Sequence, residues 1–220
     1  MVISGLMTIR FSYTLLRDWF RADLERDRPE LDGILPHQKL LLLSDGSMTL
    51  DLELLYNSKV GVEVRFKGTS PLPAEDASYL EEKPGEEAME REVWLTVDNR
   101  RLVYAHTLIP LSCIEGGLKE ELERYANEPL GRVLNANRIF FTKEKLEVGV
   151  VRCPTAAEDL GAPASTPFIA RRYILSNREA ASGWIIKASV TEIFSPGLVT
   201  SDFTKGIKLG ALRASADKFF

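Results

Sequence analysis

Charged side chains inside apolar strand patterns are the residues of this sequence best placed for chemistry. Glu192 falls in the apolar run of residues 185–194, and by strand alternation it shares a face with Val190 and Phe194. A carboxyl group on such a face is costly unless it is paired or protonated. Two interpretations stay open: an outward-facing glutamate on a half-buried strand, or a buried acid with a raised pKa that serves as a general acid or hydrogen-bond donor.

Three arginines stand in comparable settings. Arg91 begins one strand pattern, and the pair Arg171 and Arg172 opens another. An arginine that faces an enclosed site binds a carboxylate through two parallel hydrogen bonds. Taken singly, each arginine is more often an ordinary surface cation.

Other kinds of catalytic site have little support in the sequence. It contains no P-loop, no GxGxxG, no GxSxG and no HExxH motif. Its two histidines and two cysteines are not at metal-ligand spacing, so we expect neither a metal nor a cofactor. His106 alternates within a strand pattern, which favours a half-buried polar residue over a catalytic base.

Length and charge narrow the class of protein further. The 220 residues predict a single domain over 1–220, and the net charge of −4 argues against a general nucleic-acid binder. No apolar run approaches the roughly 18 residues of a membrane span. The first residues do not resemble a secretory signal. The two cysteines cannot form a disulfide framework, so we expect a protein of the reducing cytoplasm.

Hydrophobic periodicity predicts the elements that position these residues. Helices are predicted at residues 11–25, from Ser47 onward, at 112–126 and in a short turn after Pro129-Leu130-Gly131. Strands are predicted at residues 60–66, 92–97, 102–110, 168–176 and 184–194, and residues 139–151 form one further strand or two joined by a turn. About six strands connected mostly by hairpins favour an α+β domain, an antiparallel sheet with helices on one face.

Several segments are predicted as connections. Residues 1–36 hold the first helix and a proline-containing linker, and residues 153–167 form a loop rich in Ala, Pro and Gly. Residues 68–90 contain three prolines and, between Glu75 and Glu90, seven acids. A connection of this length and charge predicts a mobile acidic loop of the kind that often serves as a lid.

Six short motifs occur in order between about residues 40 and 196. They are Asp45-Gly46-Ser47-Met48-Thr49, Arg91-Glu92-Val93-Trp94-Leu95, the strand that ends in Leu108-Ile109-Pro110, Glu128-Pro129-Leu130-Gly131, Arg171-Arg172-Tyr173 and Thr191-Glu192-Ile193-Phe194-Ser195-Pro196. In this order and spacing the chain resembles the chorismate pyruvate-lyase superfamily, which includes the 4-hydroxybenzoate synthases and a divergent lyase-like branch.

The resemblance implies a six-stranded antiparallel sheet around an internal ligand cavity closed by flaps, with residues 68–90 as one flap. It implies that Arg91 anchors the aromatic carboxylate and that Glu192 acts at the ether oxygen, by proton donation or hydrogen bonding. The positions that it implies for substrate binding are Met48, Leu130, Gly131, Arg171 and Arg172, the two arginines as a second carboxylate contact.

The implied activity is cleavage of chorismate to 4-hydroxybenzoate and pyruvate without a metal or redox cofactor, for a quinone or another aromatic metabolite. Two alternatives stay open: a non-catalytic carboxylate-binding domain of the sensor type, and a lyase that acts on a related enolpyruvyl or aromatic acid. The chain departs from the family pattern where Leu50 and Asp51 follow Met48-Thr49 in place of a basic residue, and in the tail at residues 197–220.

Overall fold

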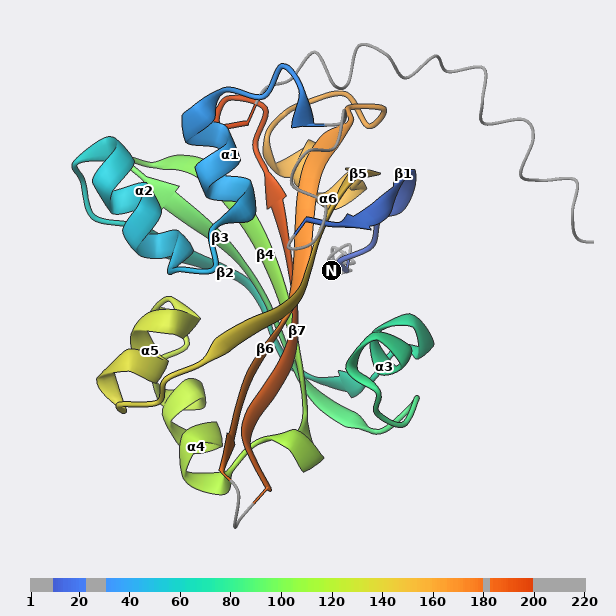
Figure 1. Ribbon diagram of the computed structural model, residues 1–220, viewed down its shortest axis with the longest axis vertical. Helices are drawn as coiled ribbons and strands as arrows, with labels where there is room; N and C mark the ends of the chain where they lie inside the picture. Colours follow the sequence, from blue (N-terminus) through green and yellow to red (C-terminus); the bar gives the residue numbers. More distant parts are fainter. Residues whose placement is uncertain (1–9, 23–30, 180–182, 200–220) are drawn as a thin grey trace, which may run out of the picture.

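One antiparallel sheet forms the centre of the molecule in the computed structural model, which describes residues 10–22, 31–179 and 183–199 (Figure 1). Its seven strands within this part of the chain follow the order β1-β5-β6-β7-β4-β3-β2. The strands are β1 (Thr14–Arg21), β2 (Gly61–Pro71), β3 (Glu87–Val97), β4 (Arg100–Pro110), β5 (Thr142–Arg152), β6 (Phe168–Glu179) and β7 (Gly183–Phe194). The predicted α+β class is confirmed, with seven strands instead of the expected six.

Helices cover both faces of this sheet, and not one face as predicted (Figure 1). The larger core lies between one face and the helices α1 (Pro36–Leu43), α2 (Met48–Tyr56), α4 (Gly116–Arg124) and α5 (Leu130–Ala136). The other face is covered by α3 (Ala74–Leu80) and α6 (Pro154–Asp159). The described strands other than β2 therefore contribute apolar residues to cores on both faces. A charged residue on one of these strands faces one of two separate environments, depending on its position in the alternation.

The N-terminal segment is a strand, and the helix predicted at residues 11–25 is wrong over its described part. β1 pairs with β5, with register shifts on either side of Arg17. Those irregularities put Leu16 and Phe20 against one core and Leu15 and Trp19 against the other, which imitates helical spacing. Gly149 on β5 leaves room for this strand, because a Cβ atom there would lie 2.8 Å from the Trp19 ring.

The segment at residues 68–90 is not the long loop that its charge predicts. β2 continues to Pro71, α3 follows, and β3 begins at Glu87. Leu80 of α3 packs with Leu108 and Ile174 on the face that carries the smaller cores. The sequence did not reveal the helix because only seven residues form it between two prolines.

Two further segments are more regular than predicted. Residues 142–152 form one strand, β5, whose register shifts between Glu144 and Glu147 where Lys145 adopts a φ of 51°. This bulge explains the polar break that suggested two strands. The loop predicted at residues 153–167 contains α6, which begins with Pro154 at its first position.

Local signals located several elements correctly. Ser47 caps α2, since its side chain accepts a hydrogen bond from the backbone N–H of Leu50. The β3–β4 hairpin turns at Asp98 and Asn99, which have φ angles of 48° and 61°. This turn sets the register that places Arg91 opposite Thr107.

Candidate active site

A pocket lies on the face of the sheet that α2 and α5 cover. Its floor comes from β3, β4, β7, β6 and β5, and the segments around Met48 and Leu130 form its walls. The volume open to the centres of water molecules is about 60 Å³.

Strand alternation decides which charged residues reach this pocket. On β3, Arg91 and Val93 line it, whereas Glu90 and Glu92 lie on the other face with His106 and Tyr104. On β7, Val190 and Glu192 line it. Arg91 and Glu192 therefore meet at one pocket although they are 101 positions apart in the chain.

Glu192 is a buried carboxylate with two partners. Arg171 Nε donates a hydrogen bond of 2.5 Å to its Oε2, and the Tyr173 hydroxyl donates one of 3.2 Å to its Oε1. Its exposed fraction is 4% and that of Arg171 is 0%. Burial raises the pKa of Glu192, but the charges of Arg171 and Lys143 and the hydrogen bonds from Arg171 and Tyr173 outweigh it, so the net pKa is lowered.

This environment corrects one expectation. The glutamate is neither outward-facing nor an acid with a raised pKa, because a guanidinium group shares its burial. An ionised carboxylate accepts protons and hydrogen bonds and has no proton to donate. The chemistry open to Glu192 at neutral pH is that of a base or a hydrogen-bond acceptor.

Arg171 is not among the residues that line the pocket, but it positions Glu192 through the hydrogen bond from its Nε. Its Nη1 also donates to the carbonyl oxygens of Leu41, at 2.6 Å, and Ser44, at 3.0 Å. These contacts connect the end of α1 and the chain before α2 to the floor of the pocket. The Nη2 of Arg171 has no hydrogen-bond partner among the described residues, and the expected contact of Arg171 with a substrate carboxylate stays a prediction.

Arg172 lies on the opposite face of the sheet, and its predicted place in the site is corrected. It forms ion pairs with Glu147, at 2.7 Å, and Glu75, at 2.9 Å. Its guanidinium also lies over the rings of Trp19 and Tyr79. Adjacent residues of a strand face opposite sides, so only one of the two arginines could reach the pocket face.

Arg91 lines the pocket as a cation without a counter-ion among the residues that the structure describes. Its Nη2 donates to the carbonyl oxygens of Ala126, at 2.6 Å, and Glu128, at 2.7 Å. Burial lowers its pKa to about 10, and its Nε has no hydrogen-bond partner among the described residues. A guanidinium with an unused buried N–H and no ion-pair partner in the described part of the chain favours an anionic ligand.

The remaining predicted residues also meet at the pocket. Met48 is the first residue of α2, and Leu130 and Gly131 are the first two residues of α5. All three line the pocket. Their helices pack on the same core as Val190, so the two walls are held by the same apolar layer as the floor.

The sequence did not reveal several residues of the site, and the charged one among them is Lys143. Its Nζ donates a 2.6 Å hydrogen bond to the carbonyl oxygen of Gly46 and lies 4.5 Å from the centre of the Tyr173 ring. Other lining residues that it missed include Thr107, Phe141 and Tyr173. Continuous alternation through residues 142–152 would have placed Lys143 on a sheet face, but the bulge at Lys145 concealed it.

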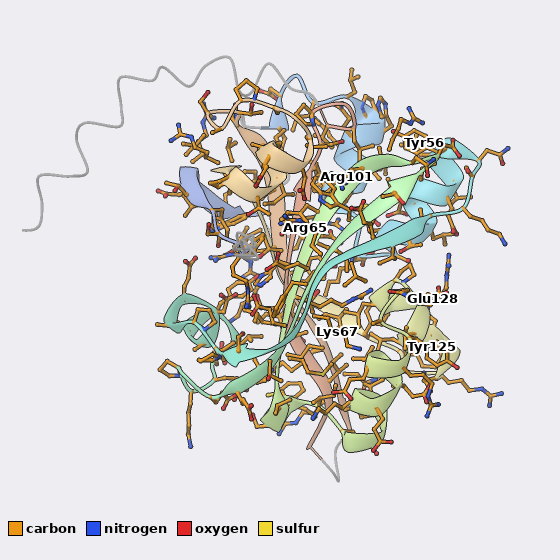
Figure 2. The ribbon with its side chains drawn as sticks, turned by 180° about the vertical axis from the view of Figure 1, so that it is seen from behind. Tyr56, Arg65, Lys67, Arg101, Tyr125 and Glu128 are labelled. Carbon is orange, nitrogen blue, oxygen red and sulfur yellow. The ribbon has the colours of Figure 1, made fainter. Side chains whose placement is uncertain are left out.

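A second, smaller pocket of about 20 Å³ adjoins the first and shares Arg91, Thr107 and Leu130 with it. Lys67 and Tyr125 line its outer part, where β2 approaches the α4–α5 side of the molecule (Figure 2). The rest of its lining is mostly apolar and consists of Met89, Glu90, Ile109, Leu122 and Val133. Arg91 therefore stands between two connected spaces.

The described residues contain no group of three or more His, Cys, Asp or Glu side chains that could hold a metal ion. Cys113 and Cys153 are both buried free thiols, and burial raises the pKa of each to about 11. His106 lies on the face opposite the pocket, with Nε2 3.0 Å from Glu90 Oε1. Within the same part of the chain, no helix has the length and apolar character needed to span a membrane.

Comparison with known proteins gives matches in sequence and in structure. Residues 42–201 match the family model described as "Chorismate pyruvate-lyase Rv2949c-like". A "Probable chorismate pyruvate-lyase" of Pseudomonas aeruginosa is 27% identical over 180 residues, 82% of this chain and 92% of that protein. One from Marinobacter nauticus is 36% identical over 106 residues, 48% of this chain and 54% of that protein.

Among solved structures, the effector domain of PhnF from Mycobacterium smegmatis is similar, with a TM-score of 0.55 and 18% identity. The match covers 69% of this chain and 90% of that domain. At this identity the likeness shows a shared fold.

Proposed function

The chain belongs to the chorismate pyruvate-lyase Rv2949c-like family, and from this premise we propose that it cleaves chorismate to 4-hydroxybenzoate and pyruvate. The observation that carries the proposal is one pocket that holds two complementary groups: Arg91, a cation with no counter-ion in the described part of the chain, and Glu192, a buried ionised carboxylate. These are the two charges that an elimination from an anionic cyclohexadiene requires: one to hold the substrate and one to accept a proton.

In the proposed complex Arg91 binds the ring carboxylate of chorismate. Its unused Nε–H supplies one donor, and the two carbonyl oxygens on its Nη2 hold the guanidinium in place. Apolar residues beside it, Val93, Leu95 and Leu130, suit the faces of the ring. Binding energy at the carboxylate then fixes the orientation of the ring relative to Glu192.

The chemical step follows from the charge of Glu192. The carboxylate takes the proton from C4 of the ring, and the electrons of that C–H bond form the C3–C4 double bond. The C3–O bond breaks, and its electron pair leaves with the enolpyruvyl oxygen. The ring becomes aromatic, and the enolate takes up the proton to give pyruvate, so no oxidant is consumed.

Arg171 makes this role possible by keeping Glu192 ionised while water is excluded. A buried carboxylate without a partner would take up a proton and would no longer serve as a base. Tyr173 donates to the second oxygen of Glu192 and limits its rotation. The substrate meets a base in a fixed position and of fixed charge.

The decisive test is incubation of the purified protein with chorismate, with 4-hydroxybenzoate and pyruvate measured by chromatography against a protein-free control. We expect equal amounts of both products, at least about 100-fold less from Glu192→Gln, and unchanged yield from Arg172→Gln on the opposite face. Tight binding of 4-hydroxybenzoate without turnover would instead indicate a carboxylate-binding domain or a lyase for another substrate. Absence of both turnover and binding would overturn the assignment of the site.

A further inference from the structure

The pocket contains a second cation that the proposed reaction step does not use. Besides Arg91, Lys143 lines it, and neither residue forms an ion pair with any part of the chain that the structure describes. The charge of Arg171 is matched by Glu192 at 2.5 Å. Two positive charges are therefore left without a paired anion in one pocket.

Lys143 extends from β5 over the ring of Tyr173, and its ammonium is 2.6 Å from the carbonyl oxygen of Gly46. One neutral acceptor leaves two of its three N–H donors free for a ligand. Burial and the positive charge of Arg171 together lower its pKa to about 8. The acids that act against this are Glu192 on β7, Asp51 on α2 and Asp45 before α2.

The two cations stand at opposite ends of the pocket floor. Arg91 lies on β3 and Lys143 on β5, which are four steps apart in the order β5-β6-β7-β4-β3. At about 4.8 Å per strand their backbones are roughly 19 Å apart, and both side chains reach inward from those edges. Glu192 on β7, the middle strand of the five, lies between them.

This spacing fits a ligand with two separated anionic groups and a reactive centre between them. We propose that Lys143 binds the second carboxylate of a dianionic substrate, so that the pocket selects cyclic dicarboxylates over monocarboxylates. The inference rests on the proposed function, where this second group is the carboxylate of the enolpyruvyl ether. Lys143 then also lies close to the leaving group and stabilises the negative charge that develops on it.

Lys143 also tethers the chain at Gly46, so a structural role has to be separated from a binding role. Lys143→Gln removes the charge but keeps an N–H donor for the Gly46 carbonyl, and Lys143→Arg keeps the charge. Lys145→Gln is a matched control: it is two positions away, and its ammonium pairs with Glu81 and contacts Tyr79 on the other face. A purely structural role predicts that Gln preserves binding.

Two stable ligands give the readout, measured by calorimetry. They are 4-hydroxybenzoate, with one carboxylate, and 3-(carboxymethoxy)-4-hydroxybenzoate, which adds a second carboxylate through an ether at the ring position of the enolpyruvyl group. For Lys143→Gln we expect the Kd of the dianion to rise at least about 30-fold and that of 4-hydroxybenzoate to change less than about twofold. For Lys143→Arg and for Lys145→Gln, we expect the Kd of each ligand to stay within a few-fold of the value for the unmodified protein.

The pH dependence adds a readout that a tether would not move. The affinity of the unmodified protein for the dianion should fall above about pH 8 as Lys143 loses its proton, whereas Lys143→Arg should keep its affinity there. Equal weakening of both ligands by Lys143→Gln would overturn the inference. Failure of the unmodified protein to cleave chorismate would reject the proposed function, while the comparison of the two ligands would still test Lys143.

Discussion

Replacing Arg171 by methionine tests the electrostatic reasoning about the site most directly. The substitution leaves Glu192, which is 4% exposed, without the guanidinium that donates to its Oε2. Removing one partner of a buried ion pair typically costs about 3–5 kcal/mol, because the other charge stays buried. For a domain of this size that corresponds to a melting temperature lower by about 6–20 °C.

The loss of stability in Arg171→Met has two parts, because Arg171 pairs with Glu192 and also donates to the carbonyl oxygens of Leu41 and Ser44. A double-mutant cycle with Glu192→Gln separates the two parts. Arg171→Met removes the backbone contacts whether residue 192 is Glu or Gln, but it removes the charge pairing only when residue 192 is Glu. We expect the double variant to be more stable than the sum of the two single effects by about 2 kcal/mol or more.

The assay is urea unfolding at pH 7, followed by tryptophan fluorescence, for the unmodified protein, both single variants and the double variant. A cost below about 1 kcal/mol for Arg171→Met, or additivity within about 0.5 kcal/mol, would refute the view that the pair is buried and coupled. In that case the lowered pKa of Glu192 and its role as a base would lose their physical basis.

Four further predictions concern the same pocket and its surroundings. Glu192→Gln should lower kcat with chorismate at least about 100-fold while circular dichroism remains that of the folded protein. Arg91→Ala should weaken the binding of 4-hydroxybenzoate by about 2 kcal/mol or more in calorimetry, and unchanged affinity would show that Arg91 is not the anchor of the carboxylate. Arg172→Gln should leave kcat/KM within about threefold, since a larger loss would place that residue in the site after all. Because the pKa of Lys143 falls from 10.5 to about 8 on folding, the unfolded chain binds more protons between those values, so the free energy of unfolding should rise with pH across this window and rise less in Lys143→Gln.

Elements with a local chemical signal could be predicted from the sequence. Ser47 offers the side-chain oxygen that a helix N-terminus needs, and it caps α2. Asp98 and Asn99 tolerate positive φ angles, which a two-residue hairpin requires. The alternation around Glu192 placed it on the pocket face of β7. In each case the deciding interaction spans only a few residues.

Features that depend on distant partners could not be predicted. β1 exists because β5 offers it an edge and a glycine beneath Trp19, and neither is visible in residues 11–25. The direction of the pKa shift of Glu192 depends on its cross-strand neighbour Arg171, 21 positions earlier. Arg172 was the avoidable error, since alternation alone assigns neighbouring strand residues to opposite faces.

Strand register makes this arrangement a site, and apolar residues set the register. Residue 171 pairs with residue 192 across β6 and β7, and residue 192 pairs with Ala105 on β4. A slip of one residue on β7 would turn Glu192 to the opposite face and also expel Val190 and Phe194 from the larger core. Both faces of β7 are buried, so the cost of the slip is that of side chains misfitted in packed cores. Overpacking typically costs about 1–3 kcal/mol, so the slip is opposed without any help from the ion pair. Arg171 and Glu192 are therefore free to serve the chemistry of the pocket, and for the same reason the double variant is expected to fold.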